Sequence, residues 1–150
     1  MRVLALDLGT RTGWAYRDKA DALCSSGYAD FKNGRFEGGG MRFLSFRRWL
    51  ENNWTSPKPD VVYLEEVANH KGIAAAHVYG GLLAILTTWC EEHAIPYQGI
   101  PVGTIKKHLT GKGNAKKDKM IAAIQEKGYN FVVDDNEADA IAILICGVDS

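Results

Sequence analysis

The sequence predicts an α/β fold in which a mixed five-stranded sheet is flanked by helices. Short strand-like segments crowd the first third of the chain, and segments of helical periodicity alternate with two further strand-like runs after it. With 150 residues, 46% of them hydrophobic, the chain is long enough for one core and short for two. We therefore expect one domain that spans residues 1–150.

Five segments carry strand signals. Residues 3–6 form a continuous apolar run, which is typical of a buried central strand. Residues 13–16 and 27–31 alternate in the manner of two further antiparallel strands. Residues 60–64 form a second apolar run that ends in acid, and residues 95–100 are short enough to complete the sheet.

The helices are predicted from the spacing of apolar residues. Residues 41–54 place leucines and aromatic side chains at roughly helical intervals between arginines, after a glycine-rich loop at 32–40. The other expected helices are 73–93, 102–109, 115–127 and 135–147.

Composition limits the classes of function. Lys and Arg number 18, as do Asp and Glu, so any surface for nucleic acid has to be local. Cys24, Cys90 and Cys146 lie far apart without CxxC spacing, which argues against a disulfide framework or a zinc site. The start lacks the pattern of a signal peptide, and residues 73–90 fit a buried helix better than a membrane span. We expect a cytoplasmic protein with no membrane partner.

Two of the predicted strands end in acid, at Asp7 and at Glu65. If these strands are neighbours, the two carboxylates meet at one sheet edge and repel each other unless a counter-ion lies between them. Magnesium is such an ion, because it prefers oxygen ligands and keeps sites for water and phosphate. The alternative is that Asp7 only begins a turn with Gly9 and that Glu65 and Glu66 are solvated.

The predicted last helix carries a further acid. Asp139 follows the first turn and stands among residues that should be buried, so it needs a partner. Asp135 and Asn136 lie four and three residues earlier, on the same helix face. Asp134 and Glu137 are explained mainly as a capping box.

These acids predict a site for two Mg²⁺ ions, with Mn²⁺ able to substitute, and hence phosphodiester hydrolysis. In this interpretation Asp7 bridges the ions, while Glu65, Asp139 and a fourth ligand complete them.

Four stretches together resemble the RuvC family of Holliday junction resolvases, and the likeness is closest to its compact phage-encoded members. They occur in the family's order and cover essentially the whole chain: residues 4–15, 64–67, 111–117 and 137–142. The resemblance implies an RNase H-like fold, a homodimer and paired incisions in a four-way DNA junction. Phage origin also implies the host cytoplasm.

Position by position, the resemblance implies that Asp7, Glu65 and Asp139 are catalytic metal ligands and that Glu66 is not. The family's fourth acid falls where this chain has Asn136. Asparagine offers a carbonyl oxygen, but Asp135 also brings charge, so we favour Asp135 and keep Asn136 as the rival.

One loop departs from the family pattern. The family often places an aromatic residue after the second acid to wedge into the opened junction, whereas this chain has Val67 to Gly72 there. His70 or Lys71 is a candidate for the DNA contact, and a solvated loop pair is the alternative.

Positive charge gathers around a glycine turn at 111–113, which predicts a surface for DNA phosphates. Arg11 is a further candidate because it follows Asp7 closely. The lysines of this region that we expect to bind DNA are Lys106, Lys107, Lys112, Lys116 and Lys117.

The helix predicted at 73–93 is apolar around much of its circumference, with Gly80 and Gly81 at its centre. Small residues allow close approach of another helix, so this helix is a candidate for the homodimer interface. Burial against the chain's own sheet is the alternative.

Three other functions remain open on the sequence. A YqgF-like nuclease of the same fold would act on RNA or in repair. A nucleotide-binding protein of the actin and Hsp70 type shares a first phosphate loop like residues 7–10 but needs two lobes. A junction-binding module would use the acids only for structure.

Overall fold

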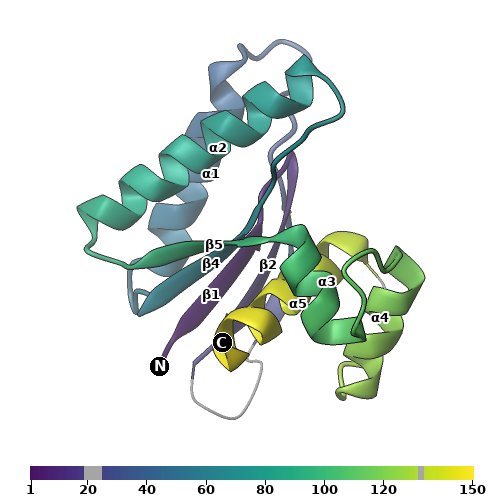
Figure 1. The fold of residues 1–150 in the computed structure, drawn as a ribbon. Coiled ribbons are helices and arrows are strands. Elements are labelled where there is room, and N and C mark those ends of the chain that lie inside the picture. Colours follow the sequence, from purple (N-terminus) through teal and green to yellow (C-terminus); the bar gives the residue numbers. More distant parts are fainter. Residues whose placement is uncertain (19–24, 132–133) are drawn as a thin grey trace.

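The computed structural model describes residues 1–18, 25–131 and 134–150, so Cys24 lies outside the described residues. Its centre is a five-stranded sheet with helical layers on both faces (Figure 1). Across the sheet the strand order is β3-β2-β1-β4-β5. The strands are β1 Val3–Asp7, β2 Arg11–Arg17, β3 Ser25–Asp30, β4 Val61–Glu66 and β5 Tyr97–Pro101.

The pairing confirms a mixed sheet. β1 pairs antiparallel with β2, which pairs antiparallel with β3, while β1 and β4 are parallel, as are β4 and β5. The carboxyl ends of the three parallel strands therefore meet at one edge of the sheet, where the turn after Asp7 and the loop after Glu66 begin.

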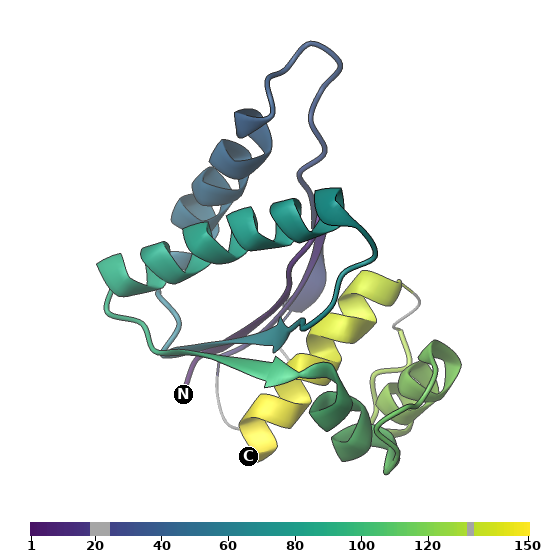
Figure 2. The same cartoon turned by 45° about the horizontal axis from the view of Figure 1, so that its top comes forward.

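Two helical layers cover the sheet. Figure 2 shows α1 and α2 on one face and α3, α4 and α5 on the other. The predicted boundaries of helices and strands agree with the observed ones to within two residues. The helices are α1 Gly40–Trp54, α2 Ile73–Glu92, α3 Val102–Thr110, α4 Lys117–Glu126 and α5 Asp135–Asp149.

The alternation of side chains along β1 shows on which face of the sheet Asp7 lies. Leu4 and Leu6 are buried in the core under α1 and α2, whereas Val3 and Ala5 are buried in the core under α5. Since successive side chains in a strand point to opposite faces, Asp7 shares the α5 face with Val3 and Ala5.

Glycines allow two close contacts of α5 with the sheet. A β-carbon on Gly13 of β2 would lie 1.8 Å from the main-chain oxygen of Asn136, at the start of α5. A β-carbon on Gly147, near the end of α5, would lie 2.4 Å from the ring of Tyr63 in β4. Side chains at these positions would force α5 away from the sheet, so the two glycines determine how closely α5 packs against it.

Helix α2 is buried on one face only. Its buried residues include Leu82, Leu86 and Trp89, which pack into the core shared with α1. Among the described residues it is also the one helix long and apolar enough to cross a membrane by length and composition. Because α2 packs against the core, it is part of the helical layer. The sequence predicted a buried helix here, and this is confirmed only for the face of α2 that contacts the core.

Candidate active site

Asp7 ends β1 at a turn that Thr12 holds closed. The buried Thr12 hydroxyl donates a hydrogen bond to the carbonyl of Gly9 at 2.7 Å and accepts one from the Gly9 N–H at 3.4 Å. Gly13, the register partner of Asp7 on β2, is also the residue against which α5 packs. The turn, the strand and the helix are thus fixed relative to one another around Asp7.

Alternation along β4 separates its two acids. Val62 and Leu64 belong to the core under α1 and α2, and Tyr63 packs against the core under α5. Glu65 therefore faces α5, on the same side as Asp7, and Glu66 faces the opposite layer.

A tyrosine of α2 fixes the main chain around the two acids of β4. The hydroxyl of Tyr79 donates a hydrogen bond to the carbonyl of Glu65 at 2.8 Å and accepts one from the N–H of Val67 at 3.4 Å. Sequence reasoning missed Tyr79. Its signal was a lone aromatic hydroxyl directly before the glycine pair Gly80 and Gly81.

Asp139 lies one turn into α5 and is half-buried. Lys117, the first residue of α4, donates to its carboxylate at 2.8 Å. Burial opposes the charge on Lys117, but the hydrogen bond to Asp139 and the charges of Asp139, Asp135 and Asp7 outweigh it and raise the pKa of Lys117. Asp139 thus has the partner that its place in the helix requires.

Neighbouring carboxylates affect the ionisation of Asp7 and of Glu65. Burial raises the pKa of Asp7 to about 8, with further contributions from the charges of Asp139 and Glu65, while Lys117 opposes the shift. Burial and the charge of Asp139 raise the pKa of Glu65, against the effect of Lys117 and Lys106. Three carboxylates gathered with too little positive charge form a site that attracts cations.

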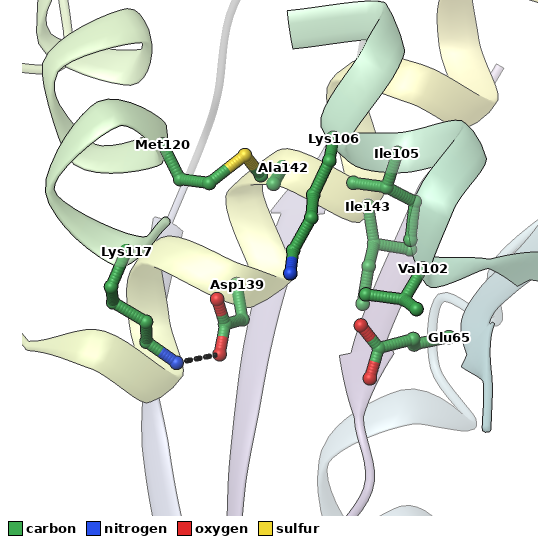
Figure 3. Close-up of a pocket in the computed structure, with 9 residues that line it drawn as sticks. All are labelled: Glu65, Val102, Ile105, Lys106, Lys117, Met120, Asp139, Ala142 and Ile143. Atoms are coloured by element: carbon green, nitrogen blue, oxygen red, sulfur yellow. Dashed lines mark hydrogen bonds and ion pairs between the residues drawn. The ribbon is translucent and has the colours of Figure 1, made fainter. Parts of the chain in front are cut away.

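A pocket of about 190 Å³ opens between Glu65 and Asp139. Lys106 of α3 and Lys117 of α4 line it, and its apolar wall includes Ile105 and Met120. Figure 3 shows the Lys106 ammonium directed into the space between the two carboxylates. Groups of both signs therefore converge on a space open to a ligand.

Among the described residues, no group of three acidic, histidine or cysteine side chains is arranged to hold a metal ion. The chemistry of the donors nevertheless suits a hard divalent cation, because Asp7, Glu65 and Asp139 supply carboxylate oxygens, and the charges of Asp139 and Glu65 add to burial in raising the pKa of Asp7. Part of their negative charge is balanced by the ammonium group of Lys117.

The residues at the start of α5 have different surroundings. Asp134 caps the helix by accepting from the N–H groups of Asn136 and Glu137, as predicted. Glu137 accepts at 2.6 Å from the hydroxyl of Ser26 on β3, a contact between sheet and helix that a capping box does not describe. Asp135 is exposed and acts on the Lys117 charge, while the main chain of Asn136 packs on Gly13.

The predicted DNA-binding residues fall in separate places. Lys106 and Lys117 line the pocket of the acids, and Lys112 and Lys116 line a hollow of about 450 Å³ at the glycine turn. Lys107 is exposed on α3. Two of the predicted cationic contacts are thus beside the acids, and the rest of this lysine set extends along α3 and the turn.

Arg11 is already engaged within the chain. Its guanidinium lies 4.0 Å from the centre of the Tyr28 ring and 3.5 Å from the carboxylate of Asp134. It remains exposed at the start of β2, close in sequence to the turn after Asp7.

The loop between β4 and α2 holds His70 and Lys71. Lys71 is exposed, whereas the ring of His70 lies 4.8 Å from the ring of Tyr79, between centroids. His70 and Tyr79 line a groove together with Arg42 of α1, which sequence reasoning also missed.

The described fold is RNase H-like, and its acids lie at the ends of two neighbouring strands and in the last helix. It resembles Thermus thermophilus RuvC in complex with a Holliday junction substrate, with a TM-score of 0.83 and 20% identity, covering 97% of this chain and 92% of that one. The yeast mitochondrial Holliday junction resolvase Ydc2 matches with a TM-score of 0.67 and 14% identity, over 98% of this chain and 77% of the other. At these identities the likeness concerns the fold.

Sequence relatives indicate the family. RuvC of Wolbachia sp. subsp. Brugia malayi, a crossover junction endodeoxyribonuclease, is 25% identical over 98% of this chain and 93% of its own length. Its counterpart from Gloeobacter violaceus is 28% identical over 98% of this chain and 87% of its own length. No family model matches the chain. The sequence and fold matches together support the resemblance of this chain to the RuvC family.

Proposed function

We propose that this protein is a structure-selective endonuclease that resolves four-way DNA junctions by paired hydrolysis of phosphodiester bonds. The observation that carries the proposal is the meeting of Asp7, Glu65 and Asp139 at one sheet edge, with Lys106 and Lys117 beside them. The names of the sequence relatives, crossover junction endodeoxyribonucleases, support the same reaction class.

In this proposal Asp7, Glu65 and Asp139 would hold two Mg²⁺ ions, with Mn²⁺ as a substitute, and Asp7 would be the ligand common to both. Bound divalent ions supply an activated water and stabilise the leaving oxygen. Lys117 balances the charge of Asp139 before substrate binds and then contacts phosphate together with Lys106. Asp135 is our fourth ligand because it brings charge, and Asn136 remains its rival.

Phosphates beyond the cut bond are held by the cationic set at the turn and around it, which contacts the backbone without reading sequence. The members of this set are Arg11, Lys71, Lys107, Lys112 and Lys116. His70, in the loop after Glu66, is a separate candidate for a DNA contact.

The protein acts as a homodimer of single-domain chains, joined through the outer face of α2. Exposed residues recur along that face at intervals of three and four: Ile73, His77, Gly80, Ala84 and Thr88. A two-fold dimer brings two sites to a two-fold symmetric junction. The compartment is the cytoplasm, that of the host cell if the gene is phage-borne.

The test is cleavage of a synthetic mobile four-way junction in Mg²⁺, compared with a flap, a duplex and a structured RNA. We expect paired symmetric incisions in the junction, and Asp7→Asn should abolish cutting while junction binding persists. Preferential cutting of RNA would favour the YqgF-like alternative. Undiminished cutting by Asp7→Asn would overturn the mechanism.

A further inference from the structure

A second hollow lies beside the turn after Asp7, on the face covered by α1 and α2. It is a groove of about 450 Å³ whose walls are the turn residues Leu8 to Thr10 and the first turns of α2. The pocket of Glu65 and Asp139 opens on the other side, between α3, α4 and α5. Asp7, which precedes Leu8 and interacts with Asp139, thus stands between two hollows of different chemistry.

The groove has the chemistry of a nucleotide site. Small apolar side chains, including Ala74 and Ala75, leave it room, and the rings of His70 and Tyr79 give it an aromatic wall. Arg42 adds positive charge and is anchored by its Nε, which donates to the carbonyl of Phe31 at 3.3 Å. The described residues that line the groove include no acid. Planar rings, apolar floor and one guanidinium suit a base and its phosphate.

Tyr79 couples the groove to the acids. Its ring lines the groove, while its hydroxyl holds the carbonyl of Glu65 and the N–H of Val67. A base that packs against this ring is therefore held at a fixed position relative to Glu65 at the end of β4. A fixed position of this kind determines which phosphate of the strand lies over Asp7, Glu65 and Asp139.

We propose that this groove receives one unpaired nucleotide of the strand being cut, next to the scissile phosphate. The base packs against His70 and Tyr79, and the phosphate of that nucleotide contacts Arg42. The inference rests on the proposed function, since it assumes a DNA strand across Asp7, and it deepens that function by naming a second contact. A branched junction supplies such a nucleotide at low cost, because bases at the branch are already partly unstacked.

The experiment fills the groove and removes the base, separately and together. Ala75→Leu adds bulk at an exposed position of α2 that lines the groove. An abasic residue is placed in the junction on either side of the mapped cut. The matched control is Ala122→Leu, the same change at an exposed position of α4. Thermal unfolding of each variant confirms that it is folded.

We expect Ala75→Leu to slow single-turnover cleavage of the intact junction about tenfold, the scale of one base–aromatic contact. The abasic junction should slow the wild-type protein by a similar factor at one of the two positions. Combined, the changes should cost no more than either alone, because both remove the same contact. Ala122→Leu should cut at the wild-type rate.

Two results would overturn the proposal while leaving the proposed function intact: Ala75→Leu cuts at the wild-type rate, or the two losses multiply. A wild-type protein that cuts no junction would instead remove the proposed function, and the groove's role would fall with it. The wild-type reaction on the intact junction therefore separates the two failures.

Discussion

Asp7 is held away from water and close to two other carboxylates, and this explains why its pKa rises to about 8. A carboxylate in that position is costly to ionise and is relieved by any bound cation. The residue that anchors the proposed metal site is thus also a residue that destabilises the metal-free fold at neutral pH.

The sign of this effect can be measured. At any pH between 3.8, the ordinary pKa of an aspartate, and about 8, the raised pKa of Asp7, the folded protein keeps a proton on Asp7 that the unfolded chain has released. The contribution of Asp7 to the free energy of unfolding therefore falls as pH rises, by up to about 1.4 kcal/mol per pH unit. Asp7→Asn should become progressively more stable than the wild type from pH 5 to pH 8. Urea denaturation in EDTA checks this, and a gap that is constant with pH would contradict it.

Tyr79 is expected to position Glu65 rather than take part in chemistry. Tyr79→Phe removes the hydroxyl from the carbonyl of Glu65 and should cost about 1 kcal/mol of stability. Because Glu65 then loses its fixed geometry, we expect the cleavage rate to fall about tenfold or more with junction affinity unchanged.

The matched control for this change is Tyr97→Phe. The hydroxyl of Tyr97 donates to the exposed Glu91, away from the acids. Equal losses of rate in the two variants would show that Tyr79 has no special role.

At the scale of elements, the contact of α5 with Gly13 sets the position of Asp139. Gly13→Ala places a methyl group 1.8 Å from the Asn136 carbonyl oxygen, so the start of α5 has to move. We expect a loss of about 2–3 kcal/mol in the free energy of unfolding, together with loss of cutting. Urea denaturation and junction cleavage measure both effects.

Gly40→Ala serves as the control, since a β-carbon on Gly40 at the start of α1 meets nothing within 4 Å. It should unfold at the wild-type denaturant concentration or slightly above it. A Gly13→Ala protein as stable and active as Gly40→Ala would mean that α5 tolerates the shift.

The turn between α3 and α4 is expected to bind phosphates additively. Each of Lys112→Ala and Lys116→Ala should lower the slope of log affinity against log salt by about 0.9. Lys58→Ala is the comparison, because the Lys58 ammonium donates to the His93 carbonyl near the start of β4, at the opposite sheet edge. Fluorescence anisotropy with a junction in EDTA measures the slopes, and equal slopes for the three variants would contradict the prediction.

The elements were predictable where local pattern and burial agree. Apolar runs that end in acid identified β1 and β4, and the change from acid to apolar residues identified the start of α5. The mixed sheet followed from that order, whereas the RNase H-like fold followed from the family resemblance. The acids at the ends of the two strands and in the last helix predicted the grouping of Asp7, Glu65 and Asp139, and the charges of Glu65 and Asp139 contribute to the raised pKa of Asp7.

Contacts between distant elements were not predictable, because one sequence gives no distances. Gly81 illustrates this: its smallness suggested a partner chain, but a β-carbon there would lie 2.3 Å from the ring of Phe43 in α1. Its role is packing within the chain, and only Gly80 faces open space. The groove likewise depends on three elements that only the fold brings together.

At the scale of the whole molecule, the outer face of α2 is the proposed dimer contact. Ala84→Arg places a charge in the middle of that face and should shift the protein from dimer to monomer in sedimentation equilibrium. A folded monomer should nick junctions singly instead of cutting both strands. Asn52→Arg, at an exposed position of α1, is the control and should remain dimeric. A wild-type protein that sediments as a monomer would contradict the prediction.

The order of elements along the chain also has a consequence during synthesis. A ribosome releases β1 with Asp7 early, but Asp139 arrives only with α5, after all the other described elements. Until α5 docks on Gly13, the growing chain lacks one of the three acids. The proposed cutting site is therefore completed only when the last of the described elements, α5, has been made and has docked on the sheet.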